Sequence, residues 1–175
     1  MSKTLYLVRH AKSSWSDSSL TDRERPLNKR GKRTAPDMGR RLAQEGHQPD
    51  LVISSPARRA FSTAKIIARA LSYDESEIII NESLYFSGEG SMVKMLKGLD
   101  DRYQSAMIVG HNPAMTGLLN LLCDAGVYNM PTCAIAIVDF DAASWSEIGD
   151  MNGHLLGYDF PKNTQGFTAG SEGVN

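Results

Sequence analysis

The fold of this chain is decided by the stretch Leu5-Tyr6-Leu7-Val8-Arg9-His10-Ala11-Lys12-Ser13. Its first part, together with Thr4, is an apolar, aromatic and β-branched run, which is typical of a buried strand. The run ends at Arg9 and His10, and a cation and an imidazole are not expected to continue a dry core strand. Because ligands bind at the carboxyl ends of the strands in an open α/β sheet, the sequence predicts that this pair lies at a site.

A second stretch shows the same pattern of an apolar run that ends at a histidine. Residues 106–109 form another apolar run, which is followed by Gly110 and His111. Either histidine alone would be interpreted as a structural residue at a strand end. Two histidines in matching contexts favour a shared functional site instead.

The hydrophobic pattern predicts three further strands and four helices. Strands are expected at residues 51–53, 78–80 and 133–140, helices at 29–45, 56–71, 92–99 and 113–125, and short edge pieces at 144–148 and 153–158. Asn28 and Ser55 are expected to cap the first two helices, with Pro56 at the first helical position. Strands that alternate with helices predict an α/β fold, a three-layer α/β/α sandwich with a mostly parallel central sheet. We expect a single domain over residues 1–160 and a flexible tail over 161–175.

The composition excludes several classes of protein. The chain has 175 residues, of which 41% are hydrophobic and 22% charged, as in an ordinary globular domain. Its net charge of -1 argues against nucleic acid as the main partner. No apolar segment approaches the roughly 18 residues that span a bilayer, and the N-terminal run is too short for a signal peptide. Cys123 and Cys133 are expected to be free, buried thiols, and we predict a cytoplasmic protein that binds no membrane.

The segment Arg23–Arg41 is locally basic, with eight Lys or Arg residues against Glu24 and Asp37. Such a segment is either a solvated helix face or a docking surface for an acidic partner. The sequence leaves both interpretations open.

Arg58 and Arg59 lie in the predicted first helical turn after Ser55 and Pro56. The N–H groups and dipole of a helix N-terminus favour anions, so cations there indicate that an anion binds nearby. Arg9, Arg59 and the two histidines, without an obvious carboxylate cluster, make a poor site for a divalent metal. They suit a phosphoryl group, whose oxygens match the guanidinium fork. We therefore expect neither a metal nor a cofactor, and a neutral histidine that could act as a nucleophile through a phosphohistidine intermediate.

Three motifs now make a family resemblance specific. They are Leu7-Val8-Arg9-His10, Ser55-Pro56-Ala57-Arg58-Arg59-Ala60 with Thr63, and Val109-Gly110-His111-Asn112. In this order they resemble the signatures of the histidine phosphatase superfamily, also called phosphoglycerate mutase-like. The short chain is most similar to the small SixA-type phosphohistidine phosphatases. The resemblance spans roughly residues 4–140 and implies the phosphoglycerate mutase-like fold.

The resemblance also implies roles for individual residues. His10 would be the phosphorylated nucleophile, Arg9 and Arg59 would bind phosphate, and His111 would donate to a phosphoryl oxygen. Arg58 would lie on the surface or the rim.

The sequence departs from the larger family members in three places. Ala11 replaces a glycine, Lys12 stands where many members carry an acid, and Ser16 stands where many carry an asparagine. The insertion of the phosphoglycerate mutases is also missing, so mutase activity is not expected.

Glu82 separates the candidate functions. An alkoxide leaving group, with a pKa comparable to that of water at about 15.7, benefits from a general acid, whereas an imidazole with a pKa near 6.5 leaves without one. If Glu82 lies in the pocket, a small-molecule phosphomonoesterase becomes plausible. If it faces solvent, phosphohistidine in a protein is the better substrate. A third hypothesis is a module that binds phosphate or a phosphoprotein without turnover.

Overall fold

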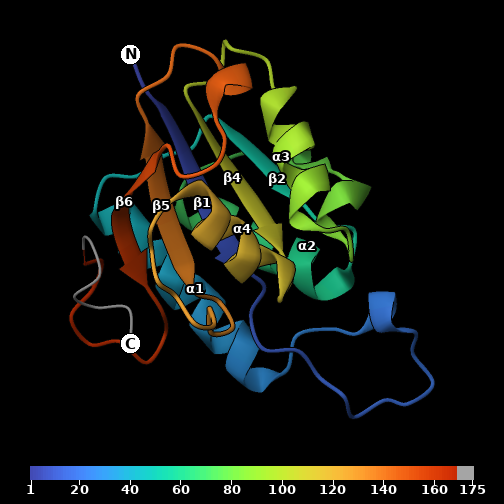
Figure 1. Cartoon of the computed structure of the whole chain (residues 1–175). Helices are drawn as coiled ribbons and strands as arrows, with labels where there is room; N and C mark the ends of the chain where they lie inside the picture. The colour runs from blue at the N-terminus through green and yellow to red at the C-terminus, as the bar shows by residue number, and fades with distance from the viewer. Residues whose placement is uncertain (169–175) are drawn as a thin grey trace.

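Six strands form one central sheet, in the order β3-β2-β4-β1-β5-β6 (Figure 1). The computed structural model describes residues 1–168. The strands are β1 (Lys3–Arg9), β2 (Leu51–Ser54), β3 (Ile79–Ile80), β4 (Ser105–Gly110), β5 (Ile135–Phe140) and β6 (Gly153–Asp159). The first four strands of this order pair in parallel, and β5 and β6 pair antiparallel. The predicted α/β fold with a mostly parallel sheet is confirmed.

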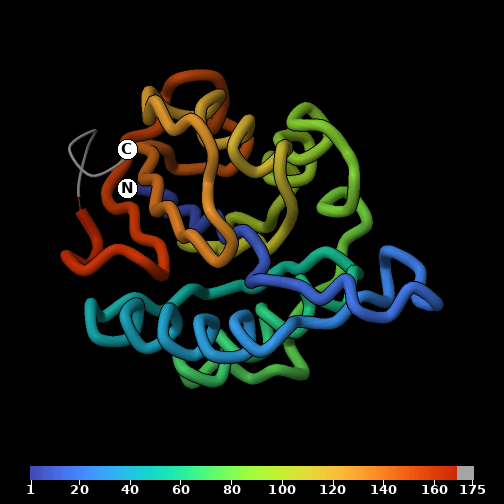
Figure 2. The backbone as a smooth tube through the Cα atoms, turned by 90° about the horizontal axis from the view of Figure 1, so that it is seen from below, coloured from blue at the N-terminus to red at the C-terminus, as the bar shows by residue number. Residues whose placement is uncertain are grey.

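Helices cover both faces of the sheet. They are α1 (Lys29–Gln44), α2 (Arg58–Ala70), α3 (Glu89–Lys97) and α4 (Ala114–Leu122). Helices α1 and α2 lie on one face of the sheet and α3 and α4 on the other (Figure 2). One apolar core lies under α1 and α2, and a second core lies under α3 and α4. Right-handed crossovers explain the division: the chain first moves from β1 outward to β3 and then reverses to β4, so the crossover helices change face.

The reversal brings β1 and β4 side by side. Arg9 pairs with Gly110 in the register of these strands, and the His10 backbone N–H donates to the Gly110 carbonyl over 3.0 Å. The helix that follows β1 lies on one face, and the helix that follows β4 lies on the other. Ligands of such sheets bind in the crevice at this topological switch point.

Two details of the predicted elements are wrong. Helix α2 begins at Arg58 with Ala57 as its N-cap residue, so Ser55 and Pro56 precede the helix. The Ser55 hydroxyl instead lies 2.7 Å from a ring nitrogen of His111. The piece at 144–148 contains a 3-10 turn, Trp145–Glu147, and is not a strand.

The C-terminal segment continues against the body of the domain. Phe167 packs on the core under α1 and α2, and Thr168 exchanges two backbone hydrogen bonds with Tyr158, of 2.9 and 3.2 Å. Residues 161–168 therefore do not form the flexible tail that the sequence predicts from residue 161. The remaining residues, 169–175, lie outside the described part of the chain. None of the helices in residues 1–168 has the length and apolar character needed to cross a bilayer.

Candidate active site

A pocket of about 290 Å³ opens at the carboxyl ends of β1 and β4. Four residues expected there from the sequence line it together: Arg9, His10, Arg59 and His111. The remaining lining comes from the loop after β1, from the segments after η3 (Glu82–Leu84) and β4, and from the segment between α4 and β5: Lys12, Ser13, Trp15, Asp22, Arg25, Phe86, Asn112 and Thr132. The pocket thus combines the sheet edge with a covering loop.

The His10 side chain is held in one orientation and is uncharged. Its Nδ1 lies 2.7 Å from the Ala11 carbonyl oxygen, which can only accept, so Nδ1 carries the proton and the lone pair is on Nε2. Burial, with smaller contributions from His111, Arg59 and Arg9, lowers the pKa of His10 to about 3. At neutral pH the ring is therefore a neutral imidazole with a nucleophilic Nε2.

Thr63 ties the residue after His10 to α2. Its hydroxyl accepts from the Ala11 backbone N–H over 3.0 Å and donates to the Arg59 carbonyl over 2.7 Å. This link joins the strand end that carries His10 to the helical turn that carries Arg59. The positions of the two side chains are consequently coupled.

His111 lies beside His10, with 5.1 Å between the ring centroids. Its Nε2 is within hydrogen-bond distance of the Ser55 hydroxyl, and its Nδ1 lies 3.4 Å from an Arg59 guanidinium nitrogen. Burial and the charge of Arg59 lower the pKa of His111 to about 4. The second histidine is therefore also neutral at pH 7.

The arginines of the pocket present donors that an anion can use. Arg9 donates Nη1 to the Met130 carbonyl over 2.8 Å, while its buried Nε has no hydrogen-bond partner among the described residues. Arg59 is only 3% exposed at the first turn of α2, whereas the neighbouring Arg58 is exposed outside the pocket. A buried N–H left without a partner in protein is costly, which favours an anionic ligand beside Arg9.

Asp22 is a pocket residue that was not predicted from the sequence. Its carboxylate pairs with Arg59 at 3.0 Å and with Arg25 at 2.9 Å, and the Tyr85 hydroxyl donates to it over 2.7 Å. Burial raises the pKa of Asp22, but the hydrogen bonds from Tyr85 and Arg59 lower it by more than burial raises it. The pKa of Asp22 therefore lies below its ordinary value. The carboxylate is ionised, and its partners form a ready-made anion-binding group.

Two exposed aromatic side chains flank the mouth of the pocket. Trp15 is 75% exposed and Phe86 is 68% exposed. The guanidinium of Arg25 lies 3.3 Å from the centroid of the Trp15 ring, and Phe86 packs at 5.8 Å from His111. The loop after β1 that carries Trp15 therefore lies over the site.

Glu82 does not line the pocket. Its side chain is 67% exposed and forms a two-pronged ion pair with Arg23, with distances of 2.8 and 3.2 Å. Ser16 is likewise exposed, and its hydroxyl contacts that of Ser14. The hypothesis that Glu82 supplies a general acid therefore does not fit the geometry.

The metal-ligating side chains of the described part of the chain are dispersed. Within residues 1–168, no three His, Cys, Asp or Glu residues are grouped as a metal site. The pocket itself gathers guanidinium groups and neutral imidazoles around Asp22. Such a donor set suits an oxyanion.

The lowered pKa values of the two histidines predict sensitivity to acid. An unfolded chain, with ordinary pKa values near 6.5, takes up these protons before the folded chain does, so the histidines reduce stability as the pH falls from about 6.5 toward 3 or 4. At pH 5 the loss is about 2 kcal/mol per histidine. Urea unfolding at pH 7 and pH 5 should show a smaller loss for His10→Gln than for the wild type. His154→Gln, on the exposed side of β6, is the control, and equal losses in all three proteins would contradict the prediction.

Known proteins are similar to this chain in both sequence and fold. The family model for the histidine phosphatase superfamily (branch 1) matches residues 5–85. An uncharacterized chloroplastic protein of Arabidopsis thaliana is 30% identical over 161 residues, which cover 87% of this chain and 73% of that protein.

Solved structures give the same picture. A protein assigned as the phosphohistidine phosphatase SixA of Agrobacterium tumefaciens superposes with a TM-score of 0.78 at 27% identity, covering 91% of this chain and 98% of that one. The protein histidine phosphatase SixA in complex with tungstate has the same fold, with a TM-score of 0.77 at 23% identity over 90% and 97% of the two chains.

Proposed function

The chain belongs to the histidine phosphatase superfamily, and from this premise we propose that it hydrolyses phosphohistidine in a protein, without a metal, through a phosphorylated His10. The observation that carries the proposal is the fixed, neutral imidazole of His10. Its Nδ1–H donates to the Ala11 carbonyl, which leaves the lone pair on Nε2. His10 lines the pocket together with Arg9 and Arg59.

The proposed reaction has two displacements at phosphorus. In the first, Nε2 of His10 forms a bond to phosphorus while the P–N bond of the substrate breaks, and the leaving imidazole nitrogen keeps the electron pair. In the second, a water oxygen attacks the phosphorus of phospho-His10. The bond to Nε2 breaks, the electron pair returns to His10, and the water protons leave with inorganic phosphate and the solvent. Two easier steps thus replace one difficult step.

The charged groups of the pocket act on the transferring phosphoryl group. Arg9 and Arg59 are proposed to donate to its oxygens, with Arg59 exchanging the Asp22 carboxylate for phosphate. In the structure Arg59, which can only donate, lies 3.4 Å from Nδ1 of His111, so Nδ1 accepts and Nε2 donates to the Ser55 hydroxyl. When Arg59 turns to the phosphoryl group, we propose that Ser55 donates to Nε2 instead and the His111 proton moves to Nδ1, which donates to a phosphoryl oxygen. Preorganised donors of this kind are usually the largest contribution to such catalysis.

The chemistry of the leaving group favours phosphohistidine over an ester. An alkoxide needs a proton from an acid, but Asp22 is ionised and Glu82 lies outside the pocket. An imidazole needs no such acid because its pKa is near 6.5. The exposed Trp15 and Phe86 also offer flat apolar surfaces to an imidazole ring or a polypeptide at the mouth.

The test compares substrates under metal-free conditions. Wild-type protein with a chelator present is given a phosphohistidine peptide, the matching phosphoserine peptide and a panel of sugar phosphates. We expect kcat/KM for the phosphohistidine peptide to exceed that for each ester by at least about a hundredfold, an effect of roughly 2.7 kcal/mol. Faster ester turnover, or loss of all turnover with the chelator, would overturn the proposal.

We further propose a cytoplasmic location. The support is the chemistry of Cys123 and Cys133, which are both free and buried, as is usual where thiols are kept reduced.

A further inference from the structure

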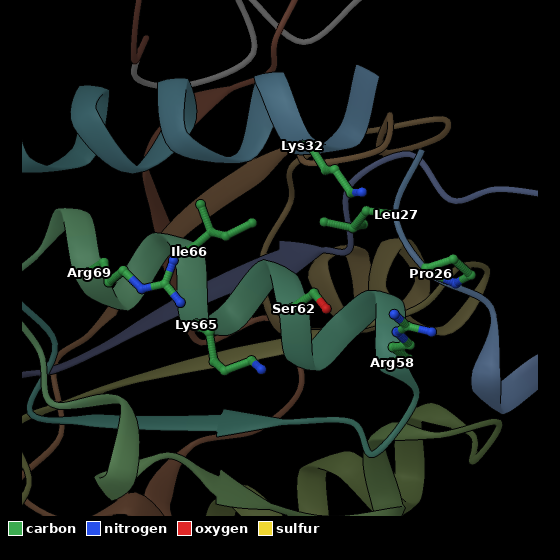
Figure 3. A pocket seen from close by; sticks show the side chains of 8 residues that line it. All are labelled: Pro26, Leu27, Lys32, Arg58, Ser62, Lys65, Ile66 and Arg69. Atoms are coloured by element: carbon green, nitrogen blue, oxygen red, sulfur yellow. The ribbon is translucent and has the colours of Figure 1, made fainter. Parts of the chain in front are cut away.

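A second concave site lies between α1 and α2, outside the catalytic pocket (Figure 3). We call it the basic groove, and it has a volume of about 300 Å³. It is lined by Pro26, Leu27, Lys32, Arg58, Ser62, Lys65, Ile66 and Arg69. Four of these eight residues are cations and none is an acid.

The cations of the groove are poorly neutralised by the protein. Arg69 pairs with Glu75 at 2.8 Å. Lys32, Arg58 and Lys65 form no ion pair within residues 1–168. The Lys65 ammonium lies over the ring of Phe61, 4.6 Å from its centroid. Cations gathered in a recess raise its positive potential, which attracts anionic groups.

The groove lies next to the catalytic pocket, because residues that line the two are neighbours in the sequence. Arg58 precedes Arg59 in the first turn of α2, and Pro26 and Leu27 follow Arg25 along the covering loop. Figure 3 shows Pro26 and Arg58 together at one end of the groove, with Arg69 at the other. A polypeptide that placed its phosphohistidine in the pocket would therefore have its flanking residues within reach of Arg58.

We propose that the basic groove binds an acidic segment of the phosphoprotein substrate, next to the phosphohistidine. The inference rests on the proposed function and adds the kind of protein that the enzyme prefers. It also assigns part of the basic segment Arg23–Arg41, because Lys32 on α1 belongs to the groove. Carboxylate side chains complement the unpaired cations, and the half-buried apolar side chain of Ile66 fits the hydrocarbon part of a peptide.

The shape and charge of the protein favour a peptide over other anions. The groove is a recess between two helices, whereas an anionic membrane presents a flat surface. The net charge of -1 opposes strong attraction of the whole molecule to nucleic acid or anionic lipid. An acidic segment needs only the local charge of the groove.

The experiment uses two synthetic peptides, each with one phosphohistidine, whose flanking positions carry either Glu or Gln. For the wild type, kcat/KM should be about tenfold higher for the Glu peptide at low salt, the combined effect of a few exposed ion pairs, and the preference should shrink in high salt. The double variant Lys32→Glu/Lys65→Glu should lose this preference. Lys94→Glu, an exposed lysine on α3 at the opposite face, should retain it.

Phosphoramidate, which is too small to reach the groove, measures the catalytic centre alone and should be hydrolysed equally by all three proteins. Equal turnover of the Glu and Gln peptides by the wild type would overturn the docking proposal and leave the proposed function intact.

If no phosphohistidine were hydrolysed, the proposed function would fail, and fluorescence anisotropy of a labelled Glu-rich peptide would still test the groove. Binding that the double variant loses and Lys94→Glu retains supports the proposal. No binding, or charge-dependent binding only to phosphatidylserine vesicles, overturns it.

Discussion

Replacement of His10 by alanine should lower kcat for phosphohistidine by at least about 10⁴-fold, because His10 is the proposed carrier of the covalent intermediate. The neighbouring His111 is a poor substitute, since its Nε2 is engaged by Ser55 and its Nδ1 lies toward Arg59. The measurement is turnover of a phosphohistidine peptide, together with acid-stable or base-stable ³²P retained on the enzyme after rapid quenching. Phosphohistidine is stable in base and labile in acid, so a base-stable label is expected in the wild type alone.

The matched control for this variant is His154→Ala. His154 is exposed on β6, and its loss should leave both turnover and labelling unchanged. The thermal unfolding of His10→Ala should remain cooperative. Turnover by a folded His10→Ala protein within tenfold of the wild type would show that the nucleophile is another group.

The second large effect is expected at Arg59. Arg59→Ala should lower kcat/KM for phosphoramidate by about 10³-fold, because it removes a buried charge and the two donors that we propose turn from Asp22 to the phosphoryl group. The same substitution leaves Asp22 in the pocket with one cationic partner fewer, which further opposes an anionic substrate. Arg59→Lys should recover only part of the activity, since an ammonium cannot form the two-pronged contact.

The neighbouring Arg58 provides the control. Arg58→Ala removes the same side chain from the adjacent position, but outside the pocket, so turnover of phosphoramidate should stay near the wild-type value. Equal losses for the two variants would indicate that charge at the N-terminus of α2, and not contact with the phosphoryl group, determines activity. Inorganic phosphate inhibition measured in parallel should weaken for Arg59→Ala only.

The centre of the site could be predicted because strand ends are strong local signals. Arg9 and His10 interrupt an apolar run, His111 does the same, and parallel strands deliver both to one edge. The difference between Arg58 and Arg59 also followed from the sequence motif, and the structure places only Arg59 in the pocket.

The covering loop could not be predicted in the same way. The fold of residues 13–26 depends on contacts distant in sequence, such as those of Asp22 with Arg59 and Tyr85, and no periodic pattern reports them. Glu82 was ambiguous for a similar reason, because its direction is set by Arg23 on that loop. The Ser55 cap was a sound local expectation, but Ser55 lies against His111 and the helix starts three residues later.

The pairing of β1 with β4 in the middle of the sheet affects which parts of the protein can change in sequence. Strands buried on both faces in the middle of a sheet open only when the whole domain unfolds. The proposed reacting groups therefore belong to the most persistent part of the molecule, whereas Trp15 and Phe86 lie on exposed loops. Substitutions, insertions or exchanges in those loops can select a different phosphorylated partner while the chemistry is inherited unchanged.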